Sequence, residues 1–182
     1  ENGPAGVLLR RAFIASPGCV IMTADFSQLE FRIFAHYTQD PTLLYAFTHG
    51  VDVHTMAAET LFGEATPKAR KITKNCNYAL MYGAAEQRLA ETAGLGREEG
   101  ARFLQVFRER MPSLVGWSKH IASVLDDDGF LQSLMGFRGY YPAYWSPVRS
   151  EAAEALREAS NFLMQAGAAD IEKLWQIQVH KD

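Results

Sequence analysis

The fold class is decided by one stretch near the N-terminus, Cys19-Val20-Ile21-Met22-Thr23-Ala24-Asp25-Phe26-Ser27-Gln28-Leu29-Glu30-Phe31-Arg32. Residues 19–24 are apolar and partly β-branched, which predicts a buried strand that ends at the carboxylate of Asp25. Ser27 with Glu30 three residues later is typical of a capping box and predicts a helix that runs through Ala35. This switch from strand to helix favours an α+β chain.

Helix signals fill most of the remaining chain. Prolines, capping residues and apolar periodicity predict helices over residues 41–47, 52–62, 66–82, 86–93, 97–110, 113–125 and 151–179. Residues 129–134 and 140–142, joined through residues 135–139, predict a β-hairpin before the last helix. We interpret the acid run Asp126–Asp128 as a solvated helix end and turn rather than a metal site. The expected fold class is α+β and helix-rich.

The composition is that of a globular protein. The chain has 182 residues, 48% of them hydrophobic, and a net charge of −3, so it can bury a core as one domain or as a contiguous piece of a larger enzyme. No apolar run of about 18 residues occurs, which excludes a membrane-spanning segment. The start at Glu1 shows no targeting segment, and the compartment stays open. Cys19 and Cys76 are too few for a disulfide framework and predict buried free thiols.

Asp25 is the first candidate for chemistry. A carboxylate at the end of a buried strand is held rigidly, and Mg²⁺ is typically bound by one or two carboxylates together with substrate phosphates. The alternative is that Asp25 only caps the following helix. Glu30, one helical turn further on, is either a capping partner or an acid of the same pocket.

A stripe of four side chains on the predicted helix 66–82 is the second candidate. Arg70, Lys74, Tyr78 and Tyr82 are spaced by four residues, so they share one helix face. Two cations followed by two aromatic rings suit a ligand with phosphates at one end and a planar base at the other. The alternative is a solvated basic end and an aromatic end that faces the core. Gly83 is then an ordinary helix cap.

A third pattern lies on the last helix, where Arg157, Asn161 and Gln165 repeat the same spacing before the small residues 166–169. Polar groups beside small residues suit a helix face against a partner backbone or a nucleic-acid minor groove. A solvated polar stripe is the alternative.

Five segments, taken together, resemble the motifs of family A DNA polymerases, the bacterial DNA polymerase I family. Residues 25–32 are similar to the pattern D-[YF]-S-Q-[IL]-E-x-R, and residues 51–55 to D-[IV]-H-T. The stripe with Gly83 matches R-x3-K-x3-[FY]-x3-Y-G. Residues 134–142 resemble the hairpin L-x-G-R-R-R-Y-x-P with two arginines missing, and residues 165–170 resemble Q-G-[ST]-A-A-D. The motifs occur in the family's order over nearly the whole chain.

The resemblance implies template-directed DNA synthesis by Mg²⁺-dependent nucleotidyl transfer from a dNTP to a primer 3′-hydroxyl. Asp25 would be one of two aspartates that hold two Mg²⁺ ions, and the Phe26 carbonyl would be a further ligand. Arg70, Lys74 and His54 would bind the triphosphate.

The same resemblance implies which residues contact the nucleoside and which contact the DNA. Gln28 would belong to the dNTP site, Tyr78 would stack on the incoming base or sugar, and Tyr82 with Glu30 would exclude a ribose 2′-hydroxyl. The primer-template would be contacted by Arg157, Asn161, Gln165, Gly83 and Arg138.

The resemblance also implies domains and partners. Residues 1–50 would belong to the palm with the first catalytic motif, residues 51–150 to the fingers, and residues 151–182 to the start of a palm helix. The family's third motif, with the second catalytic aspartate, is expected after residue 182, so one carboxylate ligand of the metal ions is missing from this chain. We therefore expect a polymerase fragment whose partners are primer-template DNA, dNTPs, and the thumb and remaining palm, with no membrane.

Two alternatives stay open. A single-subunit RNA polymerase shares the fold and the helix stripe, but Glu30 after Ser27-Gln28 argues against it as the ribose-excluding feature. A non-catalytic DNA- or nucleotide-binding module would follow if no second carboxylate strand existed.

Overall fold

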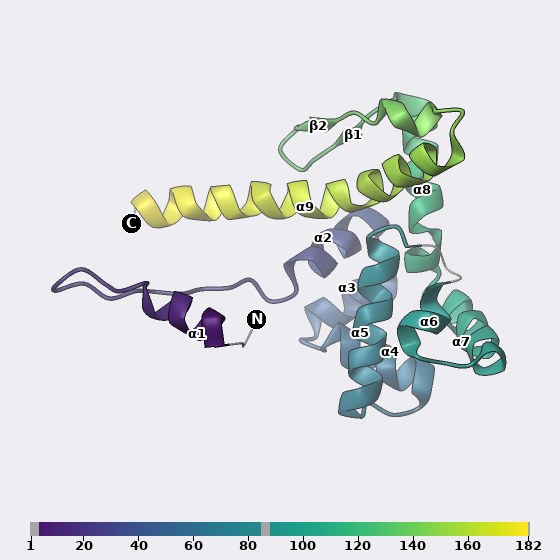
Figure 1. The fold of residues 1–182 in the computed structure, drawn as a ribbon, viewed down its shortest axis with the longest axis horizontal. Coiled ribbons are helices and arrows are strands. Elements are labelled where there is room, and N and C mark those ends of the chain that lie inside the picture. The colour runs from purple at the N-terminus through teal and green to yellow at the C-terminus, as the bar shows by residue number, and fades with distance from the viewer. Residues whose placement is uncertain (1–3, 85–87, 182) are drawn as a thin grey trace.

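The computed structural model describes residues 4–84 and 88–181, and it is mainly helical (Figure 1). In chain order the helices are α1 (Pro4–Arg11), α2 (Leu29–Thr38), α3 (Pro41–Thr48), α4 (Val53–Phe62), α5 (Pro67–Met81), α6 (Leu89–Ala93), α7 (Arg97–Arg110), α8 (Pro112–Asp128) and α9 (Arg149–Lys181). Two short strands, β1 (Leu131–Gln132) and β2 (Arg138–Gly139), and a 3₁₀ helix, η2 (Pro142–Trp145), lie between α8 and α9. The helix-rich prediction is confirmed.

Local capping explains where several helices begin. Asp40 caps α3 by accepting hydrogen bonds from the backbone of Thr42 and Leu43, and Thr66 caps α5 ahead of Pro67. The capping box predicted at Ser27 is wrong, because α2 begins after Gln28, which has a left-handed backbone and makes no side-chain cap. The side chain of Glu30 instead binds groups from α5 and α9, so it does not reach back to the helix start.

The strand predicted over residues 19–24 is also wrong. Residues 13–26 form only turns and irregular backbone, with Val20 89% and Met22 71% exposed. A strand needs a neighbour to satisfy its backbone groups, and the only strand pairing in the described part of the chain is β1 with β2. Figure 1 shows this segment running out from α2 and doubling back to α1, a helix that the sequence reading had missed. Cys19 is consequently exposed, contrary to prediction, whereas Cys76 is buried.

The core lies where α2, α5, α8 and α9 meet. Phe31 and Phe34 of α2 are fully buried, and the Phe34 ring lies edge-on against Trp117 of α8. The indole N–H of Trp117 donates to the backbone oxygen of Ser160 in α9 at 2.9 Å, so a buried polar group is satisfied across the helix pair. This packing places the start of α2 beside both α5 and α9.

The hairpin is real but shorter than expected. Leu131 pairs with Gly139 and Gln132 with Arg138 in antiparallel register. The second strand ends before the predicted residues 140–142, because Pro142 begins η2. Asp126–Asp128 form the exposed last turn of α8, as predicted. Over the described residues, every helix is too short or too polar to cross a membrane.

Candidate active site

A cavity of about 340 Å³ lies between the start of α2, the start of α4 and one face of α5. All the residues predicted to bind the metal ion or the nucleotide, except Tyr82, line this cavity: Asp25, Phe26, Gln28, Glu30, His54, Arg70, Lys74 and Tyr78. Leu29 and Asp52, which were not predicted as ligands, complete the lining. Side chains from three separate segments therefore meet at one place.

Three residues of the predicted stripe, Arg70, Lys74 and Tyr78, line this cavity. The ammonium of Lys74 lies 5.9 Å from the centre of the Tyr78 ring, and the rings of Tyr78 and Tyr82 are 5.7 Å apart. The opposite face of α5, which includes Cys76 and Leu80, is buried in the core. Burial raises the pKa of the Cys76 thiol to about 12, so it stays protonated and unreactive.

Asp25 differs from the other acids of the cavity. It is exposed and, among the residues that the structure describes, has neither a hydrogen-bond nor an ion-pair partner, whereas Glu30 and Asp52 are both held by neighbours. Its carboxylate and the adjacent Phe26 carbonyl are hard oxygen donors suited to Mg²⁺. Across residues 4–84 and 88–181, no three His, Cys, Asp or Glu side chains gather as a complete metal site. Asp25 and Phe26 thus supply two oxygen donors of the kind that Mg²⁺ prefers, which is fewer than a complete site requires.

Asp52 and Arg70 form an ion pair that the sequence reading had missed. The Arg70 Nη2 and Nε atoms lie 3.0 and 3.2 Å from the two carboxylate oxygens of Asp52. Partial burial favours a higher Asp52 pKa, but the hydrogen bonds from Arg70 and Thr55 outweigh it and lower the pKa to about 2. The sequence indicates Asp52 as the cap of α4, but no sequence pattern indicates that it pairs with Arg70, 18 residues away.

His54 lies deep in the wall of the cavity and is 3% exposed. Its ring lies edge-on to Phe31 at 5.1 Å and tilted against Tyr78 at 5.8 Å. Burial lowers the His54 pKa to about 4; Asp52 opposes this shift, and the cations of Lys74 and Arg70 add to it. The imidazole is therefore neutral at pH 7 and offers a hydrogen bond rather than a positive charge.

Tyr82 lies beyond the cavity lining but is joined to it through Glu30. The Tyr82 hydroxyl donates to Glu30 Oε2 at 2.5 Å, and the Gln165 amide donates to Glu30 Oε1 at 2.8 Å. Burial and then the Glu30 carboxylate raise the Tyr82 pKa, so the phenol keeps its proton. This cluster connects α2, the end of α5 and α9.

The other predicted DNA-binding residues lie outside the cavity, on α9 and its neighbours. Gly83 packs so closely on α9 that an added Cβ would lie 3.0 Å from the Cα of Arg157. Arg157 pairs with Glu154, and the side-chain oxygen of Asn161 is buried without a hydrogen-bond partner in the described residues. Arg138 lies on β2, with its guanidinium 4.4 Å above the Phe130 ring. The residues predicted to bind DNA therefore lie on α9, on the adjoining hairpin or, in the case of Gly83, packed against α9.

Trp175 is a further residue that sequence reasoning had missed. Its ring lies edge-on to Phe26 at 5.9 Å, and it closes a second cavity of about 130 Å³ beside Asp25. Nothing in the spacing along α9 indicates this contact, because Trp175 and Phe26 are far apart in the sequence.

Comparison with known proteins identifies the family whose motifs the sequence resembles. The profile of DNA polymerase family A matches residues 2–182. The thermostable DNA polymerase I of Thermus filiformis is 32% identical over 180 residues, covering 97% of this chain and 22% of that protein. DNA polymerase I of Caldicellulosiruptor bescii is 34% identical, with 97% and 21% covered. The chain thus spans about a fifth of the length of these relatives.

A solved structure also matches the whole fold. The POL domain of Pol1 from M. smegmatis, in complex with DNA primer-template and dNTP, superposes with a TM-score of 0.86 and 30% identity. The match covers 100% of this chain and 33% of that one. Both the sequence and the fold show that the chain belongs to DNA polymerase family A.

Proposed function

We propose that the protein carrying this chain performs template-directed DNA synthesis by Mg²⁺-dependent transfer of a nucleotide from a dNTP to a primer 3′-hydroxyl. One observation carries the proposal: a single cavity combines two cations and an aromatic ring of α5 with the carboxylate of Asp25, which has no hydrogen-bond or ion-pair partner among the described residues. The carboxylate is a donor for a metal ion, Arg70 and Lys74 are cations for a triphosphate, and the Tyr78 ring is a surface for a base.

Each residue of the cavity would have a role that follows from its chemical group. Asp25 and the Phe26 carbonyl would hold Mg²⁺, which when bound activates the attacking hydroxyl and stabilises the leaving pyrophosphate. Arg70 and Lys74 would bind triphosphate oxygens, with the neutral His54 and the Gln28 amide as further polar contacts. These cations stabilise the negative charge that develops on the transferring phosphate.

Selection of the nucleoside would fall to the aromatic end of α5. Tyr78 would stack on the incoming base or sugar. The carboxylate of Glu30, fixed by Tyr82 and Gln165, would meet a ribose 2′-hydroxyl and exclude it. This arrangement favours a DNA polymerase over a single-subunit RNA polymerase.

The primer-template would run along α9 and the hairpin. Arg157, Asn161 and Gln165 share one face of α9, and guanidinium and amide groups can hydrogen-bond to base edges and to the DNA backbone. Gly83 would act through its close packing on α9, and Arg138 through its exposed position on β2.

The rest of the polymerase is the remaining proposed partner. Residues 1–50 would be part of the palm, 51–150 the fingers, and 151–182 the start of the palm helix. The thumb, further palm strands and a second aspartate would come from outside this chain. The exposed apolar side chains of Phe13, Ile14, Val20 and Met22 support this proposal, because such surface is normally covered in a soluble protein.

Primer extension by the full-length protein tests the proposal. Asp25→Ala is expected to reduce incorporation at least about 10³-fold while primer-template binding persists. Asp127→Ala removes an equally exposed carboxylate from the end of α8 and should leave incorporation unchanged. If wild-type protein binds DNA and dNTP without incorporation, the chain belongs to a binding module instead.

A further inference from the structure

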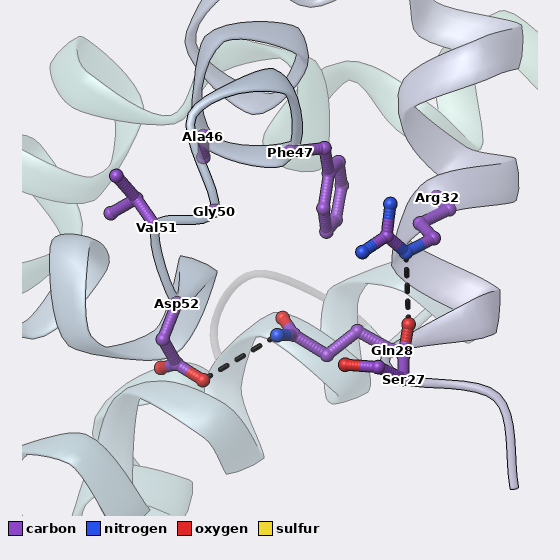
Figure 2. Close-up of a pocket in the computed structure, with 8 residues that line it drawn as sticks. All are labelled: Ser27, Gln28, Arg32, Ala46, Phe47, Gly50, Val51 and Asp52. Carbon is purple, nitrogen blue, oxygen red and sulfur yellow. Dashed lines mark hydrogen bonds between the residues drawn. The ribbon is translucent and has the colours of Figure 1, made fainter.

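The carboxylate of Asp52 joins three elements at the edge of the cavity. As the cap of α4 it accepts hydrogen bonds from the backbone N–H and the hydroxyl of Thr55, at 2.7 and 2.9 Å. It also holds Arg70 of α5 through Nε and Nη2. Gln28, just before α2, donates its side-chain amide to the same carboxylate at 3.5 Å, as Figure 2 shows.

The charge of Asp52 has the wrong sign for a triphosphate site. It lines the same cavity as Arg70 and Lys74, and an anion there repels an anionic ligand. Capping α4 does not require the charge, because Asn caps a helix as well as Asp does. A carboxylate at this place is therefore better explained by its action on Arg70.

The hydrogen bonds leave one side of Arg70 available. A guanidinium carries five N–H groups; the bonds to Asp52 use that of Nε and one of Nη2, so three remain. The Arg70 side chain is 45% exposed, and a free arginine of this kind samples many rotamers. Holding it in one orientation before the ligand arrives reduces the entropy lost on binding.

We infer that Asp52 is a positioning residue for the incoming nucleotide: it holds one edge of the Arg70 guanidinium so that the other edge is presented to the triphosphate. This inference rests on the proposed function of the cavity as a dNTP site. The hydrogen bond from Gln28 also connects the Asp52 carboxylate to the turn that follows Asp25. That turn is strained, because Gln28 has a φ of 54°, which a residue with a side chain rarely adopts.

Equilibrium binding of a dNTP tests the inference without any chemistry. The full-length protein is loaded with a primer-template whose primer ends in a 2′,3′-dideoxynucleotide, and the Kd of the correct dNTP is measured. Asp52→Asn keeps the helix cap but removes the charged contact, so the Kd should rise about three- to tenfold. With an extendable primer, KM should rise by the same factor while kcat changes less than about twofold. Asp40→Asn, a matched change at the cap of α3 outside the cavity, should alter neither value.

Coupling to Arg70 separates positioning from a general effect on the fold. In an Arg70→Ala background, Asp52→Asn should not raise the Kd further, because the carboxylate then has no guanidinium to hold and only its repulsion of the triphosphate is lost. An unchanged or lower Kd in the single variant, or an equal rise in both backgrounds, overturns the inference.

Thr55→Val provides a second variant if Asp52→Asn does not fold. It keeps both charges and the backbone cap but removes the hydroxyl that contacts Asp52 and Arg70. A smaller rise in Kd is expected, and no rise overturns the inference. Failure of the proposed function gives a different result, since the wild-type protein would then not extend an ordinary primer, whatever the Kd values of the variants.

Discussion

Glu30 is held from two sides, by the hydroxyl of Tyr82 and by the amide of Gln165. Such contacts decide what each acid of the cavity can do. Asp52 is held by Arg70 and Thr55, while Asp25 has no side-chain partner among the described residues. Because hydrogen-bonded carboxylates have fewer free lone pairs, Asp25 is the one suited to a metal ion and Glu30 the one suited to a steric role.

Tyr82→Phe tests the role of the Glu30 contacts. Removing the phenolic hydroxyl deletes a charge-assisted hydrogen bond worth about 1.5 to 3 kcal/mol, which frees the Glu30 side chain to move aside. We expect ribonucleotide incorporation relative to deoxynucleotide incorporation to rise at least about tenfold in primer extension. Tyr45→Phe, at an exposed tyrosine outside the cavity, is the control. Unchanged discrimination in Tyr82→Phe would show that Glu30 is held by other groups.

The burial of His54 predicts that the free energy of unfolding depends on pH. Its pKa is lowered from 6.5 to about 4 in the folded protein, so between these values the unfolded chain binds more protons and stability falls as the pH falls. At pH 5 the loss is on the order of 2 kcal/mol. The melting temperature of the wild type should therefore drop more between pH 7 and pH 5 than that of His54→Gln. Equal drops in the two proteins contradict a buried neutral imidazole.

Sequence reasoning predicted which residues share a helix face better than it predicted their contacts with other helices. Arg70, Lys74 and Tyr78 follow from helical spacing, since residues four apart must share a face. The Asp52–Arg70 pair and the Phe26–Trp175 contact depend on how separate helices pack, and no local pattern encodes that. The capping box at Ser27 was wrong because Glu30 has stronger partners across the fold.

The junction between helices α5 and α9 depends on Gly83. This residue has a φ of +77°, and a Cβ added there would lie 3.0 Å from both the Cα of Arg157 and the Cβ of Ser160. Gly63 ends α4 with the same φ but has open space around it. The two glycines share the backbone requirement and differ only in packing.

Gly83→Ala and Gly63→Ala form a matched pair. Both alanines adopt an unfavourable left-handed backbone at a cost of about 1 kcal/mol. Gly83→Ala also pushes α5 away from α9, which adds about 1 to 3 kcal/mol. Melting curves should show the larger loss at residue 83, and primer-template affinity should fall there alone. Equal losses would contradict the close approach of the two helices.

Elements with strong local signals were predicted well, and those that depend on distant partners were not. Helices α3, α4, α5 and α7 begin and end within a residue or two of expectation, because prolines, caps and glycines mark their ends. The strand over residues 19–24 was expected from composition alone, but a strand forms only where another strand lies beside it.

The exposed N-terminal segment predicts that the isolated chain and the full-length protein differ in their susceptibility to proteolysis. Phe13, Ile14 and Met22 are 78%, 82% and 71% exposed. If the rest of the polymerase covers them, chymotrypsin should cleave within residues 13–26 of the isolated chain much faster than in the full-length protein, as mass spectrometry of the fragments would show. Equally fast cleavage in both would mean that this surface is not an internal contact.

A structure of the full-length protein with primer-template and the correct dNTP would show whether the cavity between α2, α4 and α5 is the nucleotide site. We expect the triphosphate within hydrogen-bond distance of Arg70 and Lys74, the base or sugar against Tyr78, and Asp25 coordinating a metal ion beside the α-phosphate. A dNTP bound elsewhere, or bound here with Asp25 remote from the α-phosphate, would contradict this assignment.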